Sequence, residues 1–424
     1  MSIPGGCMSR RVVAQLSGIV LGRLVASVAQ AVTIVLLARA LSPSVFGLVI
    51  AAQAVLTALA VVLGLGFAPY IGVLRAREPG SPIVDEVFKL NRIMSWVLTC
   101  VCVAVLVVLG FIDPVFWVLT PLGVALGFQR DAAVWNSIAV ADGQVGLFSR
   151  SIAIRRVATL CIFALLLFSA TIQAVLAYCS AVLISEWFYN VRLKRRAAFV
   201  PGRVKHIQMR LILRGSKFFW LDAISGQLRL LDVAVIGVVL GPLAAGYVAV
   251  PSKVASPLML LPSSFATLIL PRVSSGCGRT VRQGVYLAMG VTSMIGVVLL
   301  VLSMYLPDLI GILLGPSYIP SVPIARIYFV GFVFLSLVYT VGAVLQGAGF
   351  QSAVGKNSAI ASVVSISVLA LAGYFWGLEA AIWAYVAALA AQVGGLAFIY
   401  IFVFRGVGRH IDSLRSDIYR TLRT

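Results

Sequence analysis

Long apolar stretches recur along the whole chain and constrain the fold more than any other feature. Twelve of them, each 18 to 26 residues long, cover approximately 17–38, 47–72, 93–112, 115–140, 153–170, 173–191, 218–240, 244–269, 285–306, 322–345, 358–376 and 379–403. A helix needs about 20 such residues to cross a bilayer, and it satisfies its own backbone hydrogen bonds there. The sequence therefore predicts an all-α membrane protein with about 12 transmembrane helices.

The composition excludes a soluble protein, since 61% of the 424 residues are hydrophobic and only 11% are charged. A net charge of +20 would suggest a nucleic-acid partner in a soluble chain. Here it reflects topology, because 27 of the 33 Lys and Arg fall on one side of the predicted spans and only Arg39 falls in a loop on the other. The first group includes Arg155 and Arg156, at the start of the fifth span. Basic loops stay in the cytoplasm, so both termini are predicted to be cytoplasmic and no nucleic-acid partner is expected.

The longest cytoplasmic segment, 192–217, divides the spans into six and six. We therefore expect an N-terminal six-helix bundle over 1–197, a basic linker over 198–217 and a C-terminal six-helix bundle over 218–424. Within the linker, basic and apolar residues alternate over 203–211. This pattern fits a strap on the inner leaflet and a solvated linker equally well.

The two halves contain a weak internal repeat at the junction of their first two spans. Pro43 and Gly47 align with Pro242 and Gly246 at a constant offset of 199 residues, within similar flanking residues. Because each half has six spans, both halves enter the membrane from the same side. The pattern predicts two parallel repeats, an arrangement typical of transporters with a central site.

Several segments also resemble one known family. The stretch 37–47 resembles the junction of the first two spans in Wzx-type polysaccharide flippases, which belong to the MOP superfamily together with the MATE exporters. Leu231 and Asp232, with the glycines that follow, are similar to the seventh and eighth spans of that family, as are Pro271 and Arg272. The segments 314–318 and 345–349 resemble its periplasmic turn before span ten and the inner end of that span.

The resemblance implies a MOP-like fold in a bacterial inner membrane. It also implies a flippase that moves an undecaprenyl-pyrophosphate-linked oligosaccharide outward for O-antigen, exopolysaccharide or capsule synthesis. The implied partners are this lipid-linked oligosaccharide, membrane lipids, and a polysaccharide polymerase with its chain-length regulator. A MATE-like small-molecule exporter is the first alternative, and a membrane polysaccharide polymerase is the second.

Charged residues inside the spans are the candidate functional residues, since each costs about 3 kcal/mol or more near the bilayer centre. Five cations and three acids give the expected cavity a net positive charge, which favours an anionic diphosphate through hydrogen bonds to arginine. The fifth cation, Arg326, is expected to reach the outer surface. The expected substrate-binding residues are Arg23, Ser27, Gln30, Arg130, Arg229 and Lys253, and the candidates for coupling to H⁺ or Na⁺ are Asp131, Asp222 and Asp232.

Each assignment has a competing structural interpretation. Arg23 shares one helix face with Ser27 and Gln30, but a snorkelling side chain would explain it as well. Asp222, Arg229 and Asp232 share a face of span seven, where an Arg229–Asp232 ion pair could serve packing alone. Span four could also end near Phe128, which would leave Arg130 and Asp131 at the membrane interface. Lys253 could pair with Asp232 or Asp222.

Three prolines, Pro251, Pro257 and Pro262, predict a bent or broken eighth span. No phosphate-binding loop is present, so ATP is not the expected energy source and no cofactor is predicted. The spacing of the six cysteines and two histidines predicts no metal site and no catalytic triad, so the chain is not expected to be an enzyme.

Overall fold

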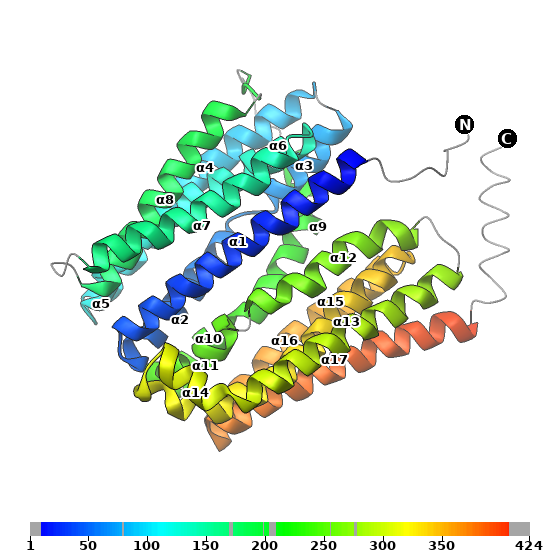
Figure 1. Cartoon of the computed structure of the whole chain (residues 1–424). Helices are drawn as coiled ribbons and strands as arrows, with labels where there is room; N and C mark the ends of the chain where they lie inside the picture. Colours follow the sequence, from blue (N-terminus) through cyan, green and yellow to red (C-terminus); the bar gives the residue numbers. More distant parts are fainter. Residues whose placement is uncertain are drawn as a thin grey trace, which may run out of the picture. The chain divides into compact units, whose positions relative to one another are not determined.

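A computed structural model of the chain describes residues 10–78, 80–168, 173–197, 199–202, 209–254, 256–274 and 278–406. Every regular element within these ranges is a helix, which confirms the predicted fold class (Figure 1). In this part of the chain, nine helices are long and apolar enough to cross a membrane. Each of the twelve predicted spans coincides with one helix or with two helices separated by a short break.

The chain forms two compact units, residues 1–257 with 306–322, and residues 258–305 with 323–424. The boundary falls inside the broken eighth span. This boundary differs from the expected division at 198–217. That division, which follows the two sequence repeats, remains a prediction. Residues 203–208 of the expected strap lie outside the described residues, and 209–217 already belong to a helix.

The first unit contains the first seven spans and the outer half of the eighth. Its helices are α1 (Arg10–Ala40), α2 (Pro43–Val62), α3 (Phe67–Arg77), α4 (Pro82–Gly110), α5 (Val115–Val118), α6 (Thr120–Ala141), α7 (Val145–Phe168), α8 (Ala174–Arg196), α9 (Met209–Leu228), α10 (Asp232–Leu240), α11 (Pro242–Val254) and α14 (Leu306–Leu313). The 3₁₀ turns η1 (Arg229–Leu231) and η3 (Pro316–Ser321) complete it. Helix α7 packs along both α1 and α8, and α6 packs between α4 and α8 (Figure 1).

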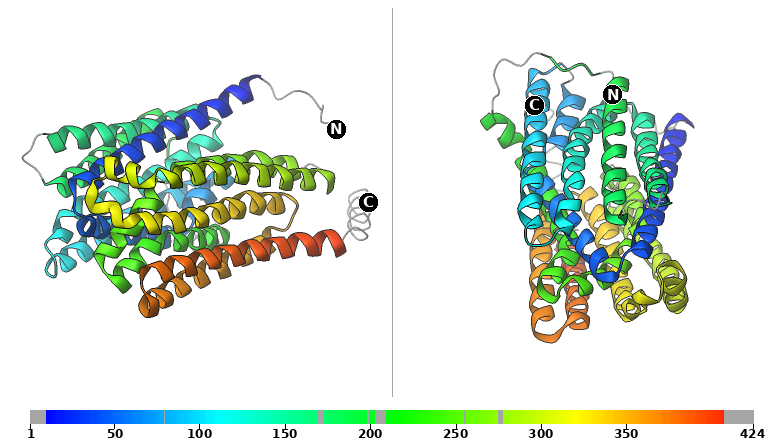
Figure 2. Two further views of the ribbon diagram at one scale, coloured as in Figure 1. Left: turned by 60° about the horizontal axis from the view of Figure 1, so that its bottom comes forward. Right: turned by 90° about the vertical axis from the view of Figure 1, so that its left-hand side faces the viewer.

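The second unit begins within the 3₁₀ turn η2 (Ser256–Met259). Its helices are α12 (Leu260–Ser274), α13 (Gly278–Met304), α15 (Val322–Gly347), α16 (Gln351–Trp376) and α17 (Leu378–Gly406). Helices α16 and α17 form a long antiparallel hairpin (Figure 2). Gly377 joins them with φ = 86°, a conformation that favours glycine.

Within the described residues, three spans are interrupted by a turn of at least three residues. The eighth is interrupted by η2 after Pro251, which confirms the expectation from its prolines. The seventh is interrupted by η1, and the second by a turn at 63–66 in which Leu65 and Gly66 adopt positive φ angles of 50° and 68°. Broken backbone is tolerated at membrane depth only where protein or a watery cavity surrounds it. A functional site is therefore expected beside one or more of these breaks.

The two repeat junctions contact each other, at the crossing of α2 and α11. A methyl group on Gly47 would overlap the carbonyl oxygen of Pro242 and the backbone nitrogen of Gly246. A methyl group on Gly246 would in turn overlap the carbonyl oxygen of Pro43. Such reciprocal contacts are what a local two-fold axis between repeats produces, and they explain why glycine stands at both positions.

The segment 314–318, which resembles the periplasmic turn of the flippase family, packs on the first of these junctions. Gly315 has φ = 101°, which permits the sharp turn after α14. Tyr318 is fully buried, its hydroxyl donates to the carbonyl oxygen of Leu41 at 3.2 Å, and its ring meets the edge of Phe46. The motif therefore anchors the 306–322 segment to the first unit.

Candidate functional site

Arg130 lies deep in the first unit and lines a cavity of about 230 Å³. Only 8% of the residue is exposed, because α6 continues to Ala141 and the neighbouring helices cover it. Helix α6 therefore continues well past Phe128, and Arg130 and Asp131 both lie inside it. The cavity lies beside the break between α2 and α3, and is lined by Thr57, Ala60, Val61, Gly64, Gly66, Phe67, Ala68, Pro69, Asn91, Leu126, Gln129, Arg130, Ala133 and Ala223.

Only one of the three guanidinium nitrogens of Arg130 has a hydrogen-bond acceptor within the described part of the chain. Its Nε donates to Oδ1 of Asn91 at 3.3 Å. Both terminal nitrogens, Nη1 and Nη2, and Nδ2 of Asn91 have no hydrogen-bond partner within the described part of the protein. A buried charge without partners costs several kcal/mol, so these donors require acceptors from outside the chain. The planar guanidinium fork matches the paired oxygens of a phosphate or a carboxylate.

Asp131 follows Arg130 in sequence but projects in another direction. Its Oδ2 atom accepts a hydrogen bond from Nδ2 of Asn190 at 3.1 Å and an ion pair from Nζ of Lys194 at 2.7 Å. Both partners lie on α8, and Asp131 lines a different pocket from Arg130. The structure thus separates two residues that the sequence analysis placed in one cavity, because successive residues of a helix point about 100° apart.

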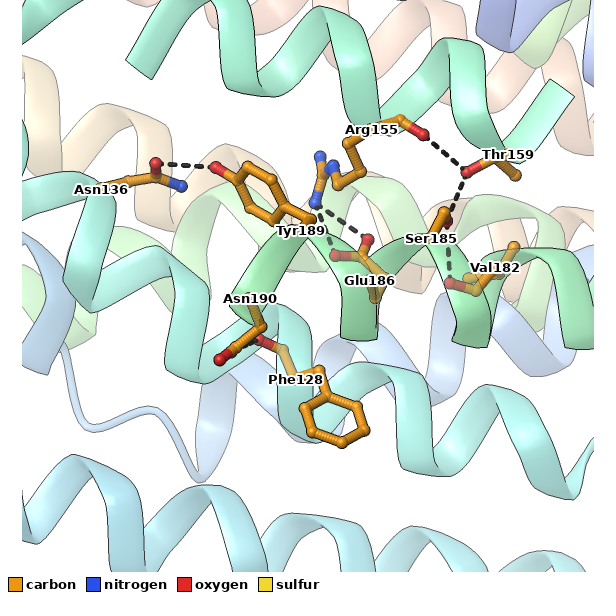
Figure 3. Close-up of polar contacts among 9 residues, drawn as sticks. All are labelled: Phe128, Asn136, Arg155, Thr159, Val182, Ser185, Glu186, Tyr189 and Asn190. Atoms are coloured by element: carbon orange, nitrogen blue, oxygen red, sulfur yellow. Dashed lines mark hydrogen bonds and ion pairs between the residues drawn. The ribbon is translucent and has the colours of Figure 1, made fainter. Parts of the chain in front are cut away.

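A buried ion pair joins α7 to α8 (Figure 3). Nη1 of Arg155 donates to both carboxylate oxygens of Glu186, at 2.9 and 3.2 Å, and the Glu186 side chain is only 4% exposed. The guanidinium also lies over the ring of Tyr189, whose hydroxyl donates to Oδ1 of Asn136 at 2.7 Å. These contacts connect α6, α7 and α8 through polar groups in the interior of the bundle.

This ion pair was not predicted from the sequence, which placed Arg155 at the cytoplasmic end of span five. In the structure, α7 begins ten residues before Arg155, at Val145. Glu186 was not predicted as a site residue, although a lone acid within the apolar span 173–191 was visible in the sequence. A lone acid in a span requires a partner, and the neighbouring span contains two arginines.

We expect Glu186→Gln to destabilise the protein by about 3–5 kcal/mol, because it leaves the Arg155 charge buried and uncompensated. Asp142→Asn is the matched control, since it breaks the more exposed Arg75–Asp142 pair of the same unit, which should contribute only about 0–1 kcal/mol. Thermal unfolding of the purified variants in one detergent measures both effects. Equal losses in the two variants would show that the interior pair has no special role.

A second charged group lies around the breaks of spans seven and eight. Arg229 opens η1, and Asp232 is the first residue of α10, where its Oδ1 accepts a hydrogen bond from the backbone N–H of Val233 at 2.8 Å. Lys253, near the end of α11, lies within electrostatic reach of both Asp232 and Arg156. This arrangement supports the interpretation that Lys253 compensates Asp232, and it adds Arg156 to the group.

Two of the remaining expected site residues do not line the Arg130 cavity. Ser27 and Gln30 are half-buried on α1, which packs along α7, and neither lines the cavity. The side chains of Arg23 and Asp222 lie outside the described residues. Arg326 is exposed on α15 of the second unit. Among the residues that the structure describes, no three His, Cys, Asp or Glu side chains come together as metal ligands would.

The sequence profile of a family described as "Polysaccharide biosynthesis protein" matches residues 12–276. The chain belongs to this family. The matched segment contains every expected site residue as well as Arg155, Glu186 and the two repeat junctions. No curated protein has a significantly similar sequence.

Solved structures with the same fold belong to the MOP superfamily. An inward-facing multidrug resistance MATE transporter has a TM-score of 0.70 at 12% identity, over 92% of this chain and 96% of that chain. The lipid II flippase MurJ, in an inward closed conformation, has a TM-score of 0.68 at 13% identity, over 92% and 87%. A MOP superfamily transporter from Pyrococcus furiosus, described as having a binding pocket of reverse polarity, has a TM-score of 0.65 at 12% identity, over 92% and 96%.

The solved structures confirm the MOP-like fold, and the family match confirms the expected link to polysaccharide biosynthesis. At such low identities the solved structures support the fold alone, so the substrate has to be argued from the site itself.

Proposed function

We propose that the protein is a flippase for polyprenyl-diphosphate-linked oligosaccharides in a bacterial inner membrane. The observation that carries the proposal is the pair of unpartnered terminal nitrogens of Arg130, which line a cavity in a member of a polysaccharide biosynthesis family. A diphosphate supplies the acceptor oxygens that these donors lack. The cargo is an undecaprenyl-linked repeat unit for O-antigen, exopolysaccharide or capsule, and a polymerase with its chain-length regulator receives it.

In this account the head group and sugars pass through an aqueous cavity while the polyprenyl tail stays in lipid. The two halves alternate between inward and outward access, as the repeat pattern predicts. Arg130 holds the diphosphate on the cytoplasmic side, and the remaining cations of the set, Arg23, Arg229 and Lys253, assist its passage. A proton or sodium gradient, coupled through Asp232 or Asp222, or consumption of the product outside, drives the cycle.

Two alternatives predict different chemistry. A MATE-like exporter of cationic drugs needs a cavity that attracts cations, whereas a buried unpaired guanidinium repels them. A polymerase needs acid, base or nucleophilic groups brought together at a site that both of its substrates reach. Arg155 and Glu186 are brought together inside the α6–α7–α8 bundle, where they form an ion pair. An interior ion pair of this kind does not offer the site that a polymerase needs.

Deletion of the gene tests the proposal. A flippase mutant accumulates complete lipid-linked repeat units in the inner leaflet, as measured by mass spectrometry of extracted lipids. A polymerase mutant would instead export single unpolymerised units. An exporter mutant would make normal polysaccharide and become drug-sensitive, and either of these two outcomes would refute the proposal.

A further inference from the structure

The first unit contains a second polar pocket, separate from the Arg130 cavity. It has a volume of about 70 Å³ and lies between α4 and α6, near the end of α8. A single water needs only about 10–15 Å³ on this measure, so the pocket has room for several heavy atoms. It is lined by Arg92, Ser95, Trp96, Thr99, Val124, Gly127, Phe128, Asp131 and Lys194.

Three of the side chains that line this pocket offer hydrogen-bond acceptors. Oδ1 of Asp131 has no hydrogen-bond partner within the described part of the chain, and only 7% of this residue is exposed. The hydroxyl of Ser95 donates to the carbonyl oxygen of Asn91, and that of Thr99 to the carbonyl oxygen of Ser95. A hydroxyl has one donor and two lone pairs, so both side chains keep acceptors for a ligand.

Gly127 on α6 gives the Thr99 hydroxyl its space, because a methyl group at Gly127 would overlap that oxygen. Three acceptors from three side chains thus line one small pocket. A primary ammonium has three N–H donors and matches this set. A quaternary ammonium has none.

Two basic side chains line the same pocket. Arg92 is exposed there, and Lys194 keeps 37% of its side chain exposed while its Nζ pairs with Oδ2 of Asp131. A bare cation entering the pocket would be repelled by both residues. A zwitterionic head group carries a phosphate as well as an ammonium. The two cations attract that phosphate, and the head group as a whole adds no net charge to the pocket.

Trp96, which also lines the pocket, is 62% exposed. Its position suits the head-group level of a membrane, where tryptophan rings collect because one edge is apolar and the other polar. The surface next to the pocket therefore suits a lipid rather than a soluble ligand.

We propose that this pocket binds the head group of an ethanolamine phospholipid, with its ammonium on Asp131, Ser95 and Thr99 and its phosphate at Arg92 and Lys194. The assignment is independent of the transported substrate. It also gives Asp131 a role other than ion coupling.

The test uses the purified full chain and four lipids with identical acyl chains: phosphatidylethanolamine, its monomethyl and dimethyl derivatives, and phosphatidylcholine. Native mass spectrometry counts the lipid retained by the protein. Retention should fall with each methyl group, and phosphatidylcholine should bind about tenfold more weakly than phosphatidylethanolamine, because it cannot donate to Asp131. Equal retention of the two end members would overturn the proposal and leave the pocket to water or a small ion.

Two variants sharpen the result. Asp131→Asn should abolish the preference for phosphatidylethanolamine, and Thr99→Val, which keeps the side-chain shape, should reduce it in part. Asp142→Asn, which changes an acid elsewhere in the same unit, should leave the preference intact. If Asp131→Asn fails to fold, the methylation series and Thr99→Val still decide the matter. A full preference in Thr99→Val and in Asp131→Asn would contradict the assignment.

Discussion

Replacement of Arg130 by Gln or Ala is expected to abolish polysaccharide export while leaving the protein folded. Two charge-assisted hydrogen bonds to a diphosphate contribute about 1.5–3 kcal/mol each, so their loss should weaken substrate binding by about 100-fold or more. Complementation of a deletion strain, with polysaccharide measured at the cell surface, provides the readout. The strain carrying the variant should accumulate lipid-linked repeat units.

The stability of the same variants separates a ligand site from a structural role. A charge without partners destabilises the empty protein, so its removal should leave the melting temperature unchanged or raise it. Arg130→Lys keeps the charge but loses the planar fork, and should support intermediate export. Gln129→Ala is the matched control, since Gln129 lines the same cavity without charge. A large fall in melting temperature for Arg130→Gln would show that Arg130 serves the fold.

Gly47→Ala is expected to disrupt the first unit. The added methyl group would overlap backbone atoms of Pro242 and Gly246, which cannot move aside as a flexible side chain would. Overpacking of this kind typically costs 1–3 kcal/mol, and contact with backbone puts the expected loss at about 3 kcal/mol or more. The yield of monodisperse protein in detergent and its melting temperature measure the effect.

Gly237→Ala is the control for this substitution. Gly237 lies in α10 of the same unit, but a methyl group there would meet only the Cβ atoms of Ala245 and Ala51, at 3.4 and 3.6 Å. These are ordinary van der Waals contacts, and alanine favours a helix by up to about 1 kcal/mol over glycine. Gly237→Ala should thus be neutral or stabilising. If Gly47→Ala were equally well tolerated, the close contact between the repeat junctions would be wrong.

The sequence predicted the helices far better than the breaks within them. Apolar length is a local property, so all twelve spans could be located from composition. The three prolines of span eight were likewise local evidence for its interruption. The turn at 63–66 and the 3₁₀ turn at 229–231 have no such marker except the glycines at 64 and 66, because the packing of neighbouring helices decides where a span can break.

For the charged residues, too, the sequence shows local properties but not the contacts that depend on helix packing. The sequence could show that Arg130 costs energy in the membrane, but not that its donors lack partners, because that depends on residues from four other helical segments. It placed Arg155 at the cytoplasmic end of span five because basic residues usually collect at such ends. Glu186, its partner, lies 31 residues away on the next helix. Asp131 was grouped with Arg130, and only the position of Lys194 on α8 showed that it belongs to a separate pocket.

Reconstituted transport tests the central claim most directly. Purified protein in liposomes would be given a fluorescent polyprenyl-diphosphate oligosaccharide, and a membrane-impermeant quencher would report its movement between leaflets. The account predicts rapid movement with the wild-type protein and with Gln129→Ala, and a loss of about 100-fold with Arg130→Gln. Equal rates for Arg130→Gln and the wild-type protein, or no movement by a folded wild-type protein under an ion gradient of either direction, would contradict it.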